Sequence, residues 1–170
     1  VEVKVEKKPM RIISGYGPQE NLNENERRAF FTALETEIIK AELDDTSVFI
    51  EMDANSKLGP DVIKGDPHHQ TPNGKILLSI IERNDLKVIN GLEKCEGVIT
   101  RKRVTKDATE ESVIDFVITS PGLEEHLQSL VIDEERKHVL THVSRSKNIV
   151  KKKESDHNVM ISRQSFTWKK

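Results

Sequence analysis

Polar side chains that can perform acid–base or metal chemistry stand directly after short apolar segments of the chain. Tyr16 follows the segment 10–13, while Asp53 and Asn55 follow the apolar run at 47–50. In layered α/β folds the ends of such strands converge on a ligand site. These positions therefore predict a site at the edge of a sheet, where a carboxylate could act as a base or hold a metal.

Asp115 is placed differently, because it lies inside the apolar run Ser112–Ile118. A buried carboxylate is costly unless it has a partner, which could be a histidine or a metal ion. Asp156 and His157 directly precede the last apolar segment and supply both a carboxylate and an imidazole. Taken alone, Asp115 could simply cap loop amides and His157 could be a structural histidine, so the order of the residues carries the functional interpretation.

The composition limits what the chain can be. Hydrophobic residues make up 35% of its 170 residues and aromatic residues only 4%, so the core must be aliphatic. The length suits one domain, and no apolar run approaches the roughly 20 residues of a membrane helix, which excludes a membrane-spanning protein. A single cysteine, Cys95, excludes an internal disulfide framework and favours a reducing compartment. With no signal peptide at its charged start, the protein is expected inside the cell, in the nucleus or the cytoplasm.

Charge is distributed unevenly along the sequence. Residues 107–135 carry nine acids and no Lys or Arg, whereas residues 136–170 carry ten bases and two acids. The basic segment could meet a polyanion, and a solvated, salt-bridged surface explains it equally well. Lys151, Lys152 and Lys153 form an expected basic loop just before Ser155-Asp156-His157, where they could hold a nucleic-acid backbone.

The apolar spacing predicts two helices among short strands. One helix is expected over 24–41, with Asn23 and Glu26 at its start, and another from Thr71-Pro72 to Asn84. Strands are expected at 10–13, 47–50, 86–89, 98–104, 113–119, 130–132, 139–143 and 157–161. Segments 98–104 and 113–119 are expected to pair, with loops at 57–70 and 144–154. This order predicts a mixed α/β layered fold.

Three motifs occur in a recognisable order: Asp53-Ala-Asn-Ser-Lys-Leu-Gly after a strand, Asp115 in Ser-Val-Ile-Asp-Phe, and Ser155-Asp156-His157. Together they resemble the endonuclease/exonuclease/phosphatase superfamily, which includes apurinic endonucleases, the deoxyribonuclease I group, inositol polyphosphate 5-phosphatases and sphingomyelinases. The sequence between the motifs is most similar to endonuclease domains of non-LTR retrotransposons. The resemblance covers about residues 12–161. It implies one domain over 1–170 with the deoxyribonuclease I-like four-layer fold, a layered β-sandwich flanked by helices.

The resemblance implies metal-assisted hydrolysis of a phosphodiester bond and gives each residue a role. Asp53 would orient and deprotonate the attacking water, and Asn55 would hydrogen-bond a phosphoryl oxygen. His157 would stabilise the developing phosphorane or move a proton, with Asp115 fixing its tautomer. Asp156 would help to hold Mg²⁺, or Mn²⁺ in its place.

The resemblance also assigns Tyr16 a contact with the scissile phosphate, and it has two departures. Met52 and Ala54 flank Asp53, where the family usually has glycine before the aspartate. The family's N-terminal strand and its principal metal-binding glutamate precede the strand matched to 10–13, and only nine residues precede that strand here. The resemblance therefore implies a domain that is incomplete at its N-terminus.

The leading hypothesis is a metal-dependent DNA endonuclease domain of retrotransposon type, whose activity as this chain is uncertain. Its partners would be DNA, with RNA as the alternative, and a reverse transcriptase fused to it or associated with it. A second hypothesis is a non-catalytic nucleic-acid-binding remnant, based on the basic segment 136–170 and the unmatched glutamate. A third keeps the superfamily and changes the activity to that of a phosphatase or a phospholipid phosphodiesterase.

Overall fold

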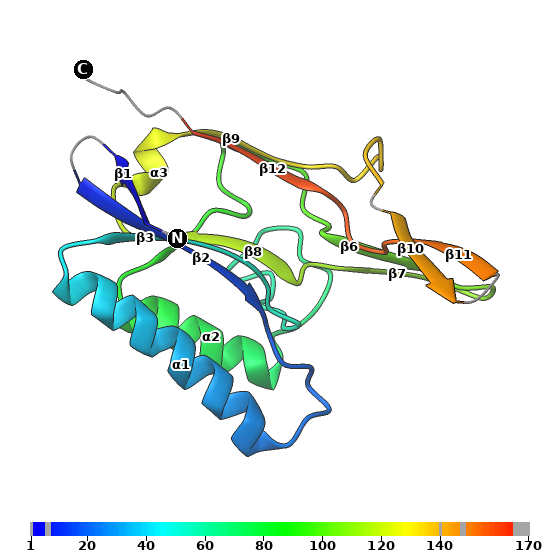
Figure 1. The fold of residues 1–170 in the computed structure, drawn as a ribbon, viewed down its shortest axis with the longest axis horizontal. Helices are drawn as coiled ribbons and strands as arrows, with labels where there is room; N and C mark the ends of the chain where they lie inside the picture. The colour runs from blue at the N-terminus through cyan, green and yellow to red at the C-terminus, as the bar shows by residue number, and fades with distance from the viewer. Residues whose placement is uncertain (1, 6–7, 140, 147–148, 165–170) are drawn as a thin grey trace.

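A computed structural model describes residues 2–5, 8–139, 141–146 and 149–164 (Figure 1). Helices α1 (Glu24–Leu43) and α2 (Pro72–Arg83) lie together on one side of a central five-stranded sheet. A three-stranded sheet lies on the other side of the central sheet (Figure 1). The predicted mixed α/β layered fold is confirmed.

The central sheet is the layer that carries the site. Its strands run in the order β1-β2-β3-β8-β4. They are β1 (Glu2–Val5), β2 (Lys8–Tyr16), β3 (Ser47–Asp53), β8 (Asp115–Thr119) and β4 (Lys87–Val88). Strands β2 and β3 are parallel and are joined through α1, as a parallel crossover requires. On β3, Val48 and Ile50 pack in the helix-side core while Phe49 packs in the core of the other side, so this strand is apolar on both faces.

Both helices begin where the sequence predicts. The Asn23 side chain accepts a hydrogen bond from the Glu26 amide at 2.9 Å, and the Thr71 side chain accepts one from the Gly74 amide at 3.2 Å. Gly74 lies so close to the preceding loop that a Cβ there would be 1.9 Å from the Lys57 carbonyl oxygen. The first turn of α2 is thereby fixed against the loop 57–70, which forms turns as predicted.

The second sheet is small and rests on the central sheet through one apolar cluster. Its order is β12-β9-β5, with β12 (Met160–Gln164), β9 (Leu127–Ile132) and β5 (Cys95–Glu96). A one-turn helix, α3 (Leu123–His126), follows Ser120-Pro121-Gly122. The cluster between the sheets consists of Met10, Phe49, Ile89, Val117, Leu127 and Leu130.

Two hairpins extend together from the same side of the layers (Figure 1). The first pairs β6 (Arg101–Val104) with β7 (Thr109–Ser112), and the second pairs β10 (Thr141–Ser146) with β11 (Ile149–Glu154). The expected pairing of 98–104 with 113–119 is therefore wrong. The basic residues of β6 pair with the acidic residues of β7, as in Lys102 opposite Glu111, while the apolar β8 enters the central sheet.

The expected loop at 144–154 is also wrong, because most of this segment belongs to the β10–β11 hairpin. Its sequence is polar on both faces, so it lacks the apolar alternation that marks a half-buried strand. Other strand boundaries differ as well. β2 begins at Lys8 and runs on to Tyr16, and β3 runs on to Asp53. β9 begins at Leu127, β10 covers Thr141–Ser146, and the last strand begins at Met160 rather than His157. Within the described ranges, no helix combines the length and apolar character needed to cross a bilayer.

Candidate active site

Three of the predicted site residues form one row across the central sheet. Tyr16 pairs with Asp53 in the parallel ladder of β2 and β3, and Asp53 pairs with Asp115 in the antiparallel ladder of β3 and β8. Side chains paired in this way project from the same face of a sheet. Phe49, four positions before Asp53 on β3, packs towards the second sheet, so the row faces that sheet as well.

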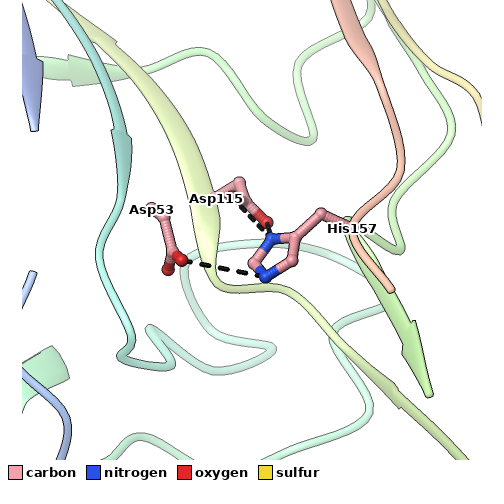
Figure 2. Close-up of side chains that lie close together, drawn as sticks. All are labelled: Asp53, Asp115 and His157. Atoms are coloured by element: carbon pink, nitrogen blue, oxygen red, sulfur yellow. Dashed lines mark hydrogen bonds and ion pairs between the residues drawn. The ribbon is translucent and has the colours of Figure 1, made fainter. Parts of the chain in front are cut away.

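His157 reaches this row from the segment that leads into β12. Its Nδ1 lies 3.1 Å from both carboxylate oxygens of Asp115, and its Nε2 lies 3.8 Å from Asp53 Oδ2 (Figure 2). Two carboxylates directly opposite each other in a ladder repel. The imidazole bridges them, and it is the histidine partner that the buried position of Asp115 requires.

Thr100, just before β6, connects the two segments that supply this pair. Its side chain is fully buried, and Oγ1 accepts hydrogen bonds from the amides of Ile114 and Asp115 at 2.9 and 3.1 Å. Its carbonyl accepts the amide of Asn158 at 2.7 Å. Thr100 thus fixes the backbone at Asp115 and at the residue after His157.

The environment shifts the protonation of two members of the cluster. Burial raises the pKa of Asp53, and the neighbouring charge of Asp115 raises it further, against the opposing effects of the Asn55 amide and His157. The hydrogen bond to Asp115 raises the pKa of His157 despite burial of the ring. Asp53 is therefore a stronger base than an exposed aspartate, and His157 holds its proton to higher pH than a free histidine.

Asp156 is held by an arginine from β6. Arg101 donates to Asp156 Oδ2 from Nε at 2.9 Å, and its Nη2 lies 2.8 Å from the same oxygen. The other oxygen, Oδ1, lies 4.0 Å from His157 Nε2. Burial alone would raise the pKa of Asp156, but the hydrogen bond and charge of Arg101 outweigh it and lower that pKa.

The row opens into a cavity of about 710 Å³, whose lining includes Tyr16, Asp53, Asp115, His157 and Lys153. The Tyr16 side chain is 67% exposed, so its ring is accessible to a molecule in the cavity. Polar groups from four strands and one connecting segment therefore converge on a single hollow, as a ligand site requires.

Asn55 lies beside the row but is directed to the backbone. Its amide N–H donates to Asp53 Oδ1 at 2.9 Å, and its Nδ2 donates to the Gly17 carbonyl at 2.9 Å. A Cβ on Gly17 would lie 2.4 Å from the Ala54 carbonyl oxygen, so these two loops are in close backbone contact. Asn55 clamps the loops together, and the second Nδ2 hydrogen is left for the predicted contact with a phosphoryl oxygen, which stays a prediction.

Solved structures share this arrangement of layers. The endonuclease domain of TRAS1, a telomere-specific non-LTR retrotransposon, matches with a TM-score of 0.65 and 15% identity, over 98% of this chain and 63% of that one. A 3′-5′ exonuclease from Neisseria meningitidis matches with a TM-score of 0.64 and 14% identity, over 98% and 64%. A mannosyl-6-phosphatase from Bacteroides thetaiotaomicron matches with a TM-score of 0.55 and 14% identity, over 95% and 53%.

The chain has the endonuclease/exonuclease/phosphatase fold. It spans less than two thirds of the length of the structures that it matches. Neither a protein-family model nor a curated protein sequence matches it. The fold and layer order agree with the deoxyribonuclease I-like expectation from the sequence.

In this endonuclease/exonuclease/phosphatase fold, the side chains at the cavity fit a divalent cation that prefers oxygen ligands. Asp53, Asp115 and His157 each place one ligand atom within 4.8 Å of the others. Asp115 is occupied by the imidazole and Asp156 Oδ2 by Arg101, which leaves Asp53 Oδ2 and Asp156 Oδ1 around His157 Nε2. Carboxylate oxygens of this kind are the protein ligands of Mg²⁺ and Mn²⁺.

The predicted lysines belong to β11 rather than to a loop. Lys153 lines the cavity and Lys152 is exposed, while the side chain of Lys151 lies outside the described residues. Their cross-strand partners on β10 are His142, Val143 and Ser144, none of which is acidic.

Sequence reasoning missed Thr100 and Arg101. Both precede or begin β6, for which the sequence pattern predicted the wrong partner strand. The run of bases at 101–103 and the acids at 110–111 were the available signal for the β6–β7 hairpin, because opposite charges across a hairpin favour that register.

Proposed function

We propose that this chain is a divalent-cation-dependent phosphodiester hydrolase that cuts DNA, as an endonuclease of non-LTR retrotransposon type. The observation that carries the proposal is the line Asp115–His157–Asp53, in which one carboxylate orients the imidazole and the other faces its second nitrogen across an open cavity. Such a pairing of a base with a polarised histidine is a recurrent arrangement for acid–base catalysis. The structural match to a retrotransposon endonuclease domain supports DNA as the substrate.

Asp53 is the base in this mechanism. Its raised pKa suits it to accept a proton from a water molecule at the cavity wall. As the water oxygen bonds to phosphorus and the phosphorus–oxygen ester bond breaks, the departing oxygen takes a proton from solvent. His157, held protonated by Asp115, donates from Nε2 to a non-bridging oxygen as negative charge builds there.

Asp156 Oδ1 would hold the divalent cation, while Asp53 Oδ2 would accept the proton of water. A bound Mg²⁺ or Mn²⁺ supplies Lewis-acid stabilisation of phosphate charge. Tyr16 lines the same cavity and would contact the phosphate, and the remaining side-chain amide hydrogen of Asn55 would donate to a phosphoryl oxygen.

The DNA backbone would follow the β10–β11 hairpin. Lys153 lines the cavity and Lys152 is exposed on the same strand, and neither faces an acidic residue across the hairpin. Lysines without a paired carboxylate release counterions when they meet phosphates. In the proposed setting a reverse transcriptase acts with the endonuclease, and reading the gene around this sequence tests that link.

The test is nicking of supercoiled plasmid by the 170-residue chain with Mg²⁺ and, separately, with Mn²⁺. His157→Ala should slow nicking by about 100-fold or more, the usual contribution of a general acid–base or charge-stabilising group. His138→Ala is the matched control, because His138 Nδ1 also lies 3.2 Å from a carboxylate oxygen, that of Asp133, on another part of the surface. Plasmid left intact by the wild-type chain, or cut equally by His157→Ala, contradicts the proposal.

Lys152 and Lys153, which have no acidic partner across the hairpin, favour one alternative, a nucleic-acid-binding protein without cleavage. Salt-dependent binding of a DNA duplex with no nicking in either metal would establish it. Phosphate release from a phosphomonoester without nicking would instead indicate a phosphatase, the activity named for the Bacteroides neighbour.

A further inference from the structure

The contact between Arg101 and Asp156 is one-sided. Both described donors of the guanidinium, Nε and Nη2, lie within 2.9 Å of Oδ2, whereas a bidentate pair would use both carboxylate oxygens. The Arg101 side chain is 23% exposed and the Asp156 side chain 38% exposed, so the pair is partly shielded from water. The carboxylate is therefore turned so that Oδ1 is directed to the His157 side.

The backbone reinforces this placement. Arg101 forms an isolated bridge with His157, and the Lys102 amide donates to the Asp156 carbonyl at 2.8 Å. Strand β6 thus fixes both the main chain and the side chain of Asp156. A carboxylate held in this way can offer a cation one oxygen but not two.

Arg101 also changes the net charge beside Asp156 and the His157 imidazole. Three carboxylates, Asp53, Asp115 and Asp156, surround one imidazole, and Arg101 adds a positive charge at their edge. A positive charge at this position opposes the binding of a cation and favours the binding of an anion.

We propose that Arg101 is a positioning residue that limits the cation affinity of the site, because it occupies one oxygen of Asp156 and places a positive charge beside the other. The inference rests on the divalent cation of the proposed function.

The test measures Mn²⁺ binding to the intact chain by electron paramagnetic resonance, without substrate. Arg101→Met keeps the length of the side chain and removes its charge, so Mn²⁺ should bind more than about tenfold more tightly: about tenfold is expected from a unit charge roughly 6 Å from a divalent ion in a water-like medium, and the release of Asp156 Oδ2 adds to it. Arg101→Lys, which keeps the charge, should stay within about threefold of wild type. Lys102→Met is the matched control, since Lys102 is paired with Glu111 at 2.7 Å on the neighbouring strand, and it should leave Mn²⁺ affinity unchanged.

A second variant shows whether the effect passes through Asp156. Measured against Asp156→Asn alone, Arg101→Met in the Asp156→Asn background should give a smaller gain in affinity than it gives with Asp156 present, because only the effect of the charge remains, and a gain of undiminished size overturns the proposal. Unchanged or weaker Mn²⁺ binding in Arg101→Met, or no Mn²⁺ bound to either protein, also overturns it. Should Arg101→Met fail to fold by circular dichroism, Arg101→Gln supplies the second variant: it keeps a polar side chain, removes the charge and should also tighten Mn²⁺ binding. The expected Mn²⁺ pattern without plasmid nicking would leave this inference standing and defeat the proposed hydrolysis.

Discussion

The β6–β7 and β10–β11 hairpins extend from the same side of the molecule (Figure 1). They differ in the charges that their sequences pair across the two strands. In the β6–β7 hairpin, basic and acidic side chains face each other, and the Lys102 and Glu111 side chains are 2.7 Å apart. In the β10–β11 hairpin, Lys152 and Lys153 are in register with Val143 and His142, neither of which is acidic. The first hairpin neutralises its own charge, whereas the second leaves positive charge for another molecule.

The end of each hairpin that joins the sheets has a different role from the turn at its far end. Thr100 and Arg101 at the base of β6 bind the backbone of Asp115 and the carboxylate of Asp156. The chain leaves β11 directly into Asp156 and His157, and it leaves β7 towards Asp115 at the start of β8. The hydrogen bond between Asp115 and His157 therefore joins the strand after the first hairpin to the segment after the second. The comparison assigns the first hairpin to positioning and the second to binding.

The largest expected effect tests the positioning role. Thr100→Val keeps the shape of the side chain but leaves the buried amides of Ile114 and Asp115 without an acceptor, so the free energy of unfolding should fall by about 3 kcal/mol. Urea denaturation measures it, and Thr100→Ser should recover most of the loss. Thr105→Val, in the exposed turn of the same hairpin, is the control and should cost less than about 1 kcal/mol. Equal losses at the two positions would remove the distinction between base and tip.

The next effect concerns the bond that joins the two hairpins. The folded pKa of His157 is raised by Asp115, so the pair stabilises the fold fully below the unfolded histidine pKa of about 6.5, and this contribution is lost as pH rises through the folded pKa. Asp115→Asn should therefore destabilise the chain most at low pH, with the difference from wild type shrinking as pH rises. Nuclear magnetic resonance titration of His157 should show its pKa lowered in the variant.

The control for this pH dependence is Asp107→Asn, in the exposed turn of β6–β7. Its difference from wild type should stay constant across the same pH range. A loss of stability in Asp115→Asn that grows with pH would mean that the imidazole is not stabilised in its charged form, and the assigned role of His157 would fail with it.

The sequence predicted the residues of the site better than the elements that hold them. Asp115 stood out because a carboxylate within an apolar run needs a partner, and the structure supplies His157 as that partner. The helix starts at Asn23 and Thr71 were predictable because capping depends on a few adjacent residues. Features of this kind can be predicted because they depend on single residues and their neighbours in the sequence.

The pairing of strands that are far apart in the sequence does not depend on single residues and is harder to predict. The pattern of β8 favours pairing with 98–104 because both are short runs with valine and isoleucine, yet burial on both faces places β8 between β3 and β4. The polar β10–β11 hairpin has no apolar face and therefore no periodic signal. The charges of β6 and β7 could have indicated their hairpin, but the contact of Arg101 with Asp156 could not be predicted, since the two residues are 55 positions apart and no local pattern links them.

A smaller effect tests the binding role of the second hairpin. Lys153→Gln and Lys152→Gln should each weaken DNA affinity by roughly three- to tenfold, and each should reduce the salt dependence of binding by about one ion. Fluorescence anisotropy over a range of salt concentrations measures both. Lys102→Gln is the control on the first hairpin, where Glu111 already neutralises the lysine, and it should change affinity by less than about twofold. If Lys102→Gln lowered DNA affinity more than the β11 variants do, the first hairpin rather than the second would be the one that binds DNA.

The smallest effect concerns the ion pair that makes the first hairpin neutral. The Lys102 and Glu111 side chains are 37% and 42% exposed, so water screens their attraction and a double-mutant cycle to alanine should give a coupling of about 0.5 kcal/mol, reduced in high salt. Such a small value fits a pair that cancels charge without holding the hairpin, while Thr100 at the base holds the site. A coupling above about 2 kcal/mol would mean that the paired charges themselves position β6, and Arg101 and Asp156 would then depend on the tip as well as the base of the hairpin.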